Sequence, residues 1–430
     1  MPMDHTRNTT PGHHADLPAP HGPSPSSDER GGLLQPDSAF DADVNGLDDW
    51  IYSTLSSMAL GEQAARAHRE TPERSQLPYT TLALYTADGL LEALEWANAG
   101  QPADENACLW LAYLRWSRTQ SSDFPAAAPT PLPRWLDRSH APSGASHLTS
   151  PLAPAVPETA GTLAGLSTGA MGEVPRPVQP AAQGADVVVR SLPLGLLPIG
   201  WKPVTTMAVN AAAITHGLPQ AHVAAVAAAL MVQATITTAR RDTITSARRD
   251  ASTPAHKNSS ATVRGSNDVV HLRAALEATV EALATTTLPV QETVEALHVI
   301  VTAADTLPSP QTAIRASTPQ LGEVSEATRT IALGIWWAMT EAHCTSTPIV
   351  GATTAEQTVA AALIGALGPA HAQAPAASHG EHPVTRRQAE PRAEAEAQPT
   401  ATGPVPMQPL VTEMTDRWAR ELGITAESTA

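Results

Sequence analysis

Apolar residues recur at a spacing of three to four in long stretches of this chain. Between positions 48 and 68, for example, Ile51, Leu55 and Met58 fall on one face of a helix. The two-residue alternation that is typical of strands competes with this pattern nowhere in the sequence. The pattern therefore predicts an all-α fold. The helices that we expect cover residues 48–68, 80–99, 103–118, 203–215, 221–239, 268–284, 289–304, 323–342 and 409–422.

Proline, glycine and small polar residues dominate the stretches between these helices. The chain has 39 Pro and 26 Gly but only 2 Phe and 4 Tyr, too few large apolar side chains to fill all 430 residues with packed structure. We expect one helical domain with Pro- and Ala-rich insertions. The expected divisions are a disordered arm at 1–40, a domain at 41–369 that is largely loop at 120–180 and 240–266, a disordered linker at 370–405, and a docking helix with a tail at 406–430.

The acidic excess of the chain argues against a nucleic-acid partner. With 26 Lys and Arg against 42 Asp and Glu, the formal net charge is −16, which disfavours attraction to phosphate backbones. The basic stretch from Arg240 to Arg264 carries no aromatic residue for base stacking. We therefore interpret that stretch as a solvated loop.

Cysteine usage and hydropathy favour a cytoplasmic location. Cys108 and Cys344 lie in apolar helical contexts, which predicts buried thiols and not the disulfide framework of a secreted protein. The first residues lack the apolar segment of an export signal. The uncharged run at 223–239 consists largely of Ala and Thr, which predicts too little hydrophobicity for a membrane span. We expect a monomeric protein without membrane contact.

Several segments agree in order and separation with one known family. TTLALYTADGLLEALEW begins at Thr80, GADVVVRSLPLGLLPIG begins at Gly184, a Thr-His-Gly turn begins at Thr215, and GATTAE begins at Gly351. These segments resemble the ADP-ribosylglycohydrolase family, to which ADP-ribosyl-[dinitrogen reductase] hydrolase belongs. Two shorter segments add to the resemblance: RGGLL at 30–34, like the opening of the family's first helix, and TLAGLSTGAMG at 162–172.

The resemblance implies a single orthogonal helical bundle that hydrolyses the N- or O-glycosidic bond of ADP-ribosylated proteins with two Mg²⁺ ions. In the family, a Thr-Asp-Asp-Thr turn and a Gly-Asp-Ser-Asp-Ser/Thr turn supply carboxylates to these ions. Here the four aspartate positions fall on Pro78, Tyr79, Ala352 and Thr354. Mg²⁺ prefers carboxylate oxygens, and neutral side chains neither neutralise two divalent ions nor activate a water.

These replacements predict a degenerate family member without bound Mg²⁺ and without a catalytic residue. Its partner would be ADP-ribose or an ADP-ribosylated protein. By their matching positions in the family, Thr80, Gly184, Arg190 and Gly351 would contact that ligand. Arg190 suits either a phosphate contact or a structural role that pins its loop, because a guanidinium serves both.

The alternative is an active hydrolase of ADP-ribose conjugates that uses relocated acids. Asp186, Glu356 and the pair Asp48 and Asp49 are the carboxylates that could replace the lost ones. The simpler interpretation makes Asp186 a solvated loop residue and the other three first-turn helix charges. His216 could be a general base, but a helix C-terminus gives a structural reason for a partly cationic ring beside exposed carbonyls.

His13 and His14 are not predicted to bind a metal, and one further hypothesis concerns the whole chain. His13 and His14 lie in the predicted arm and lack the spacing of metal ligands on an ordered element. A third hypothesis for the whole chain is an interaction protein, in which the Pro-rich arms bind partners and the helical body is a spacer.

Overall fold

The computed structural model describes most of the domain, and all of its regular elements there are helical. Within the described residues no strand forms, and an isolated bridge joins Glu173 and Arg176. The all-α prediction is confirmed. Cys108 is buried, as predicted, whereas Cys344, the histidines of the arm, the RGGLL segment and the predicted arm and linker lie outside the described residues. The structure describes residues 44, 46–67, 77–120, 124–139, 157–252, 261–306, 317–340, 347–369 and 407–424.

Every helix expected from the hydrophobic pattern is present, and α9 and α10 are several residues longer than expected. In chain order the helices are α2 Leu47–Arg66, α3 Pro78–Asn98, α4 Glu105–Gln120, α5 Trp135–Ser139, η2 Pro157–Thr159, α6 Ala160–Ser167, α7 Asp186–Ser191, η3 Leu192–Leu196, α8 Trp201–Ala213, α9 Pro219–Ser252, α10 Ala261–Ala284, α11 Gln291–Asp305, α12 Glu326–Thr340, α13 Thr354–Gly365 and α14 Met407–Glu421.

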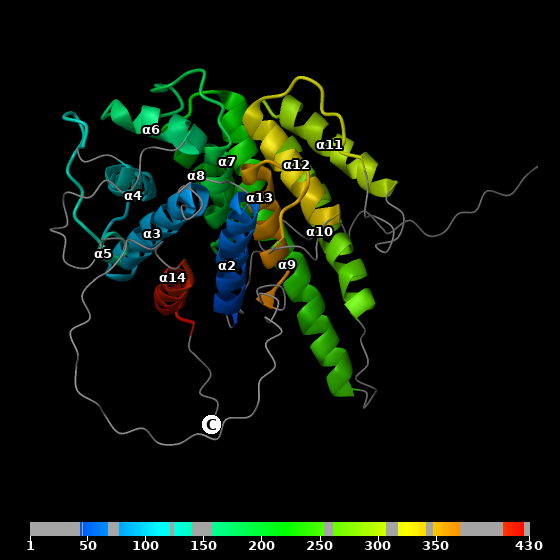
Figure 1. Cartoon of the computed structure of the whole chain (residues 1–430). Coiled ribbons are helices and arrows are strands. Elements are labelled where there is room, and N and C mark those ends of the chain that lie inside the picture. Colours follow the sequence, from blue (N-terminus) through cyan, green and yellow to red (C-terminus); the bar gives the residue numbers. More distant parts are fainter. Residues whose placement is uncertain are drawn as a thin grey trace, which may run out of the picture.

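Helices α2 and α13 pack against each other along their lengths near the centre of the molecule (Figure 1). Small residues allow their backbones to approach closely. A Cβ at Gly61 of α2 would overlap the Ala361 side chain of α13, and a Cβ at Gly365 would overlap the carbonyl of Ser53. Glycine at these positions is therefore a packing requirement and not a source of flexibility.

Helix α9 forms the core of the fold. Residues 221–236 are all buried, and α8, α10, α12 and the α7–η3 segment surround them. The segment Pro219–Ser246 reaches a mean hydropathy of 1.5, enough by length and composition to cross a membrane. The prediction that its Ala and Thr residues leave it too little hydrophobicity for a membrane span is therefore wrong. However, 94 % of its apolar window is buried inside the fold, which is the position of a core helix.

In the described residues the basic stretch is helical, so the loop predicted at 240–266 is wrong at 240–252 and 261–266. Helix α9 continues to Ser252, so that its end extends beyond the other helices in Figure 1, and α10 begins at Ala261. Ala and Arg favour helix, and no Gly or Pro interrupts the chain before Pro254. Residues 241–246, which are polar except for Ile244, are exposed on this extension, as the charge pattern indicated.

A buried ionic network joins α3, α4 and α5. Asp88 of α3 is 0 % exposed and accepts hydrogen bonds from Arg115 Nη2 at 2.7 Å, Arg134 Nε at 3.0 Å and Trp135 Nε1 at 2.9 Å. Two cations and an indole therefore compensate one buried charge. The sequence analysis did not identify Asp88, because its partners lie 27 to 47 residues further along the chain.

Candidate functional site

The start of α3 is held by a carboxylate from α2. Leu77, the N-cap residue, supplies no side-chain hydrogen bond, and Pro78 has no N–H. Glu62 of α2 accepts the next two amides, from Tyr79 to Oε1 at 3.1 Å and from Thr80 to Oε2 at 2.7 Å. Glu62 therefore supplies from another helix the N-terminal acceptor that the sequence of α3 lacks.

Burial makes Glu62 an unusual carboxylate. The side chain is 0 % exposed, and this burial raises its pKa to about 7 although the Thr80 and Tyr79 amides and the charge of Arg66 lower it. Sequence reasoning missed Glu62. A signal was present, because Glu62 follows Met58 by four residues and so falls on the apolar face of α2.

Tyr79 lies among several carboxylates. Its side chain is 4 % exposed, and burial raises the pKa of its phenol. The charges of Asp186, Glu62, Glu158 and Glu326 raise it further, in that order. Tyr79 of α3 therefore places a neutral aromatic ring where α2, η2, α7 and α12 bring acidic groups towards one another.

Asp186 is buried and paired, so its interpretation as a solvated loop residue is wrong. Asp186 is not in a loop but is the first residue of helix α7, where it is 1 % exposed. Asp186 accepts the Thr162 amide at 2.7 Å, and its Oδ1 lies 3.1 Å from His216 Nε2. Burial alone would raise the pKa of Asp186, but the charge and hydrogen bond of His216 lower it to about 2.

The ring of His216 also has a structural role, but its contacts differ from those expected. It is 0 % exposed, and its two nitrogens lie 3.1 Å from Asp186 Oδ1 and 2.9 Å from Thr215 Oγ1. Its stabilising partner is therefore a buried carboxylate and not a set of exposed helix carbonyls. Neither nitrogen faces an open site.

Arg190 lies inside the fold. Its guanidinium is 0 % exposed, donates from Nη2 to Thr215 Oγ1 at 2.8 Å and to the Ala212 carbonyl at 3.3 Å, and stacks 4.4 Å from the centre of the Tyr113 ring. These contacts join α7, α4 and the end of α8. Of the two roles that the sequence left open for Arg190, the geometry favours the structural one.

The C-terminal turn of the resemblance precedes α13. Gly351 is exposed with φ 92°, a conformation that favours glycine. Thr353 and Glu356 form a capping box: Glu356 Oε2 accepts the Thr353 amide at 3.0 Å, and Thr353 Oγ1 accepts the Glu356 amide at 3.2 Å. Burial raises the pKa of Glu356, whose Oε2 also accepts from Trp337 Nε1 at 3.3 Å. Its expected role as a first-turn charge is confirmed, as it is for Asp48 and Asp49 on α2.

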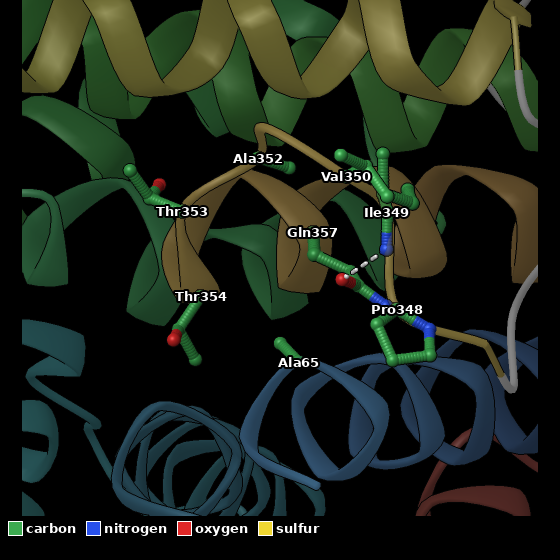
Figure 2. A pocket seen from close by; sticks show the side chains of 8 residues that line it. All are labelled: Ala65, Pro348, Ile349, Val350, Ala352, Thr353, Thr354 and Gln357. Atoms are coloured by element: carbon green, nitrogen blue, oxygen red, sulfur yellow. Dashed lines mark hydrogen bonds between the residues drawn. The ribbon is translucent and has the colours of Figure 1, made fainter. Parts of the chain in front are cut away.

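An open pocket of about 470 Å³ lies beside this turn (Figure 2). Gln357 holds one wall in place, because its Oε1 accepts the Ile349 amide at 2.9 Å and its Nε2 donates to the Thr347 carbonyl at 2.8 Å. The lining set includes no carboxylate, and Thr80, Gly184 and Arg190 are not part of it. The residues that line the pocket are Ala65, Pro348, Ile349, Val350, Ala352, Thr353, Thr354 and Gln357.

A comparison with protein families matches residues 59–372 to ADP-ribosylglycohydrolase. The chain belongs to the ADP-ribosylglycohydrolase family. The matched region begins within α2, so it leaves out the RGGLL segment, and it ends before α14. Searches of the curated proteins and of the solved structures find no match.

Members of the ADP-ribosylglycohydrolase family use Mg²⁺, and the fit of this chain to that ion depends on its oxygen donors. At the four positions equated with the family's aspartates, Pro78 and Ala352 have no side-chain oxygen, while Tyr79 and Thr354 offer a phenol and a hydroxyl. In the described part of the chain, no group of three or more His, Cys, Asp and Glu is placed to hold a metal ion. These four side chains do not fit a pair of Mg²⁺ ions.

Proposed function

We propose that this chain is an ADP-ribosylglycohydrolase-family protein that has lost the two-Mg²⁺ hydrolysis and at most binds ADP-ribose or an ADP-ribosylated protein. The observation that carries the proposal is the set Pro78, Tyr79, Ala352 and Thr354, which replaces carboxylates in two turns far apart in the sequence. Without anionic oxygens there is no group to neutralise two divalent ions or to help a bound water ionise.

The nearby carboxylates support the proposal because each already binds a helix N-terminus. Glu62 accepts the first amides of α3, Asp186 accepts the third amide of α6, and Glu356 completes the capping box of α13. Any of them that turned to a metal would leave buried N–H groups without an acceptor, at a cost of about 1–3 kcal/mol for each group.

The pocket beside Gly351 supports the remaining binding role. It lies at the N-terminal end of α13, where helix amides and the helix dipole favour an anion such as the diphosphate of ADP-ribose. No carboxylate among its lining residues would repel that group. Of the four ligand positions taken from the resemblance, Gly351 lies beside this pocket, between the lining residues Val350 and Ala352.

The alternative, an active hydrolase with relocated acids, would depend on Asp186 or Glu356. Both are buried, at 1 % and 3 % exposed, and both are occupied by the hydrogen bonds described above. Neither lines the pocket. A base in either position would have to release a helix amide before it could take a proton from water.

Calorimetric titration with ADP-ribose, with and without Mg²⁺, tests the binding role. We expect weak binding that Mg²⁺ does not change, and weaker binding still for Val350→Glu, which places a negative charge at a 94 % exposed position of the pocket wall. Val270→Glu on α10, at a 62 % exposed position away from the pocket, is the matched control. Tight binding that requires Mg²⁺ would contradict the loss of the metal site.

A hydrolysis assay separates the proposal from its alternative. The chain is incubated with an ADP-ribosylated arginine peptide and a range of divalent ions, and the release of ADP-ribose is measured. We expect no release above the uncatalysed background. Release that disappears in Asp186→Asn or Glu356→Gln would establish the alternative with its acid.

A further inference from the structure

Helix α14 is an amphipathic element whose apolar residues join the hydrophobic core of the domain. It lies beyond the region matched to the family, and residues 370–406 connect it to the end of α13. Its apolar face consists of Leu410, Val411, Met414 and Trp418, all buried, while residues such as Thr412 and Asp416 are exposed. Spacings of four between Leu410, Met414 and Trp418 form the stripe of a helix that binds in a groove.

Helix α14 lies between α2 and α3 and contacts both (Figure 1), and we call the surface of these two helices that it covers the α2–α3 groove. Helix α14 contacts each of these helices more extensively than they contact one another. It therefore fills the space between α2 and α3, and it sets how they sit against each other. The opposite end of this helix pair carries Glu62 and the amides of Tyr79 and Thr80 that it accepts.

Polar contacts fix the register of α14 in the groove at both of its ends. At its start, Gln408 Nε2 donates to Ser56 Oγ of α2 at 2.8 Å. Near its end, Trp418 Nε1 donates to the Ala87 carbonyl of α3 at 3.1 Å, and Asn98 Nδ2 donates to the Glu421 carbonyl at 2.8 Å. Each contact joins α14 to a residue of the groove and not to another tail residue.

The helix carries its own stop signal but not enough length to be stable alone. The Gly423 amide bonds the Arg420 carbonyl at 3.2 Å and the Ile424 amide bonds the Ala419 carbonyl at 2.8 Å, with Gly423 at φ 70°. These two bonds form a Schellman motif. A helix of 15 residues is marginal in water, so α14 gains its stability when it docks.

We propose that the α2–α3 groove is a helix-binding site and that α14 is its tethered, exchangeable ligand. In the intact chain α14 is covalently joined to the groove, so its binding is intramolecular and the groove is filled in cis. A free peptide with the sequence of residues 405–425 fits the same groove once the tether is cut. Trp418 is the anchor of the complex, because its buried ring also donates a directional hydrogen bond.

The test uses the full chain with a protease site inserted within 370–406. After cleavage and dilution, the released tail is removed and a fluorescently labelled 405–425 peptide is added, with binding followed by anisotropy and folding by circular dichroism. We expect saturable binding to the cut chain and binding at least about tenfold weaker to the uncut chain. A peptide with Trp418→Ala should bind at least about tenfold more weakly, whereas Asp416→Ala, at an exposed position, should bind like the parent.

An uncut chain with Trp418→Ala provides an independent measurement. Its own α14 is weakened in cis, so it should bind the parent peptide more tightly than the uncut parent chain does. The proposal is overturned if the cut chain keeps its helical signal but binds no peptide. It is equally overturned if the cut chain loses that signal when the tail leaves, because α14 would then be an integral part of the core.

Discussion

Three buried carboxylates serve helix N-termini. Glu62 and Asp186 reach from their own helices to the first turns of α3 and α6, and Glu356 closes the first turn of α13. A metal site and a helix N-terminus compete for the same carboxylate oxygens, since both supply positive charge. At the scale of single residues, the acids near Tyr79, such as Glu62 and Asp186, stabilise the fold by accepting helix amides.

Glu62→Gln should reveal a stability term that depends on pH. The pKa of Glu62 is about 7 in the folded chain against an ordinary value of 4.5, so the folded state binds the proton more tightly. Its contribution to the free energy of unfolding is thus fully present below pH 4.5 and is lost as pH rises through 7. We expect the free energy of unfolding of the parent minus that of Glu62→Gln, measured by urea unfolding, to fall by about 3 kcal/mol between pH 4.5 and pH 7. A difference that stays constant from pH 4.5 to 7 would contradict the raised pKa.

Asp186→Ala should destabilise the chain by about 3–5 kcal/mol at pH 7, because His216 and the Thr162 amide lose a buried partner. Asp186→Asn keeps an acceptor oxygen and should cost less, and Asp416→Ala at an exposed position is the control. The pKa of Asp186 is lowered from 3.8 to about 2, so its contribution is present above pH 3.8 and disappears as pH falls through 2. Equal urea midpoints for Asp186→Ala and the control would show that the pair does not stabilise the fold.

At the scale of elements, the hydrophobic pattern predicted the helices because the apolar residues that produce the pattern are the residues that the helices bury. Apolar stripes such as Ile51, Leu55 and Met58 place a helix against a core, and the observed α2 buries those residues. The errors arose where local cues misled. Charges at 240–252 suggested a loop although nothing there breaks a helix, and Asp186 was interpreted as a loop residue where buried valines form α7.

Gly61→Ala should test the close packing of α2 on α13. The added methyl overlaps the Ala361 side chain, which costs about 1–3 kcal/mol, and the better helix propensity of Ala recovers about 1 kcal/mol of that. The double variant Gly61→Ala with Ala361→Gly moves the methyl across the interface and should restore most of the loss. Thermal unfolding of the four proteins gives the coupling, and additive effects of the two substitutions would place the overlap elsewhere.

At the scale of the whole molecule, the sequence predicted the family and the fold class but not the partners at the candidate site. The Asp186–His216 pair spans 30 residues and the Asp88–Trp135 pair spans 47, so no local pattern contains either. Glu62 and the two amides that it accepts are 17 and 18 residues apart, so the same holds for them. Side-chain pairing of this kind follows from tertiary packing. The type of an element follows from periodicity, and a short stretch of sequence contains the periodicity but not the pairing.

The oxygen donors of the chain also determine whether Mg²⁺ raises its melting temperature. A ligand that binds only the native state adds about 2.7 kcal/mol at a concentration of 100 Kd, which shifts the melting temperature of a domain of this size by several degrees. Because the family's aspartate positions hold Pro78, Tyr79, Ala352 and Thr354, we expect Mg²⁺ in excess over EDTA to produce no such shift. With a net charge of −16, any divalent ion screens repulsion to a small extent, so Ca²⁺ at the same concentration is the control. A melting temperature that rises with Mg²⁺ beyond the rise with Ca²⁺ would mean that other oxygens of this chain hold the ion.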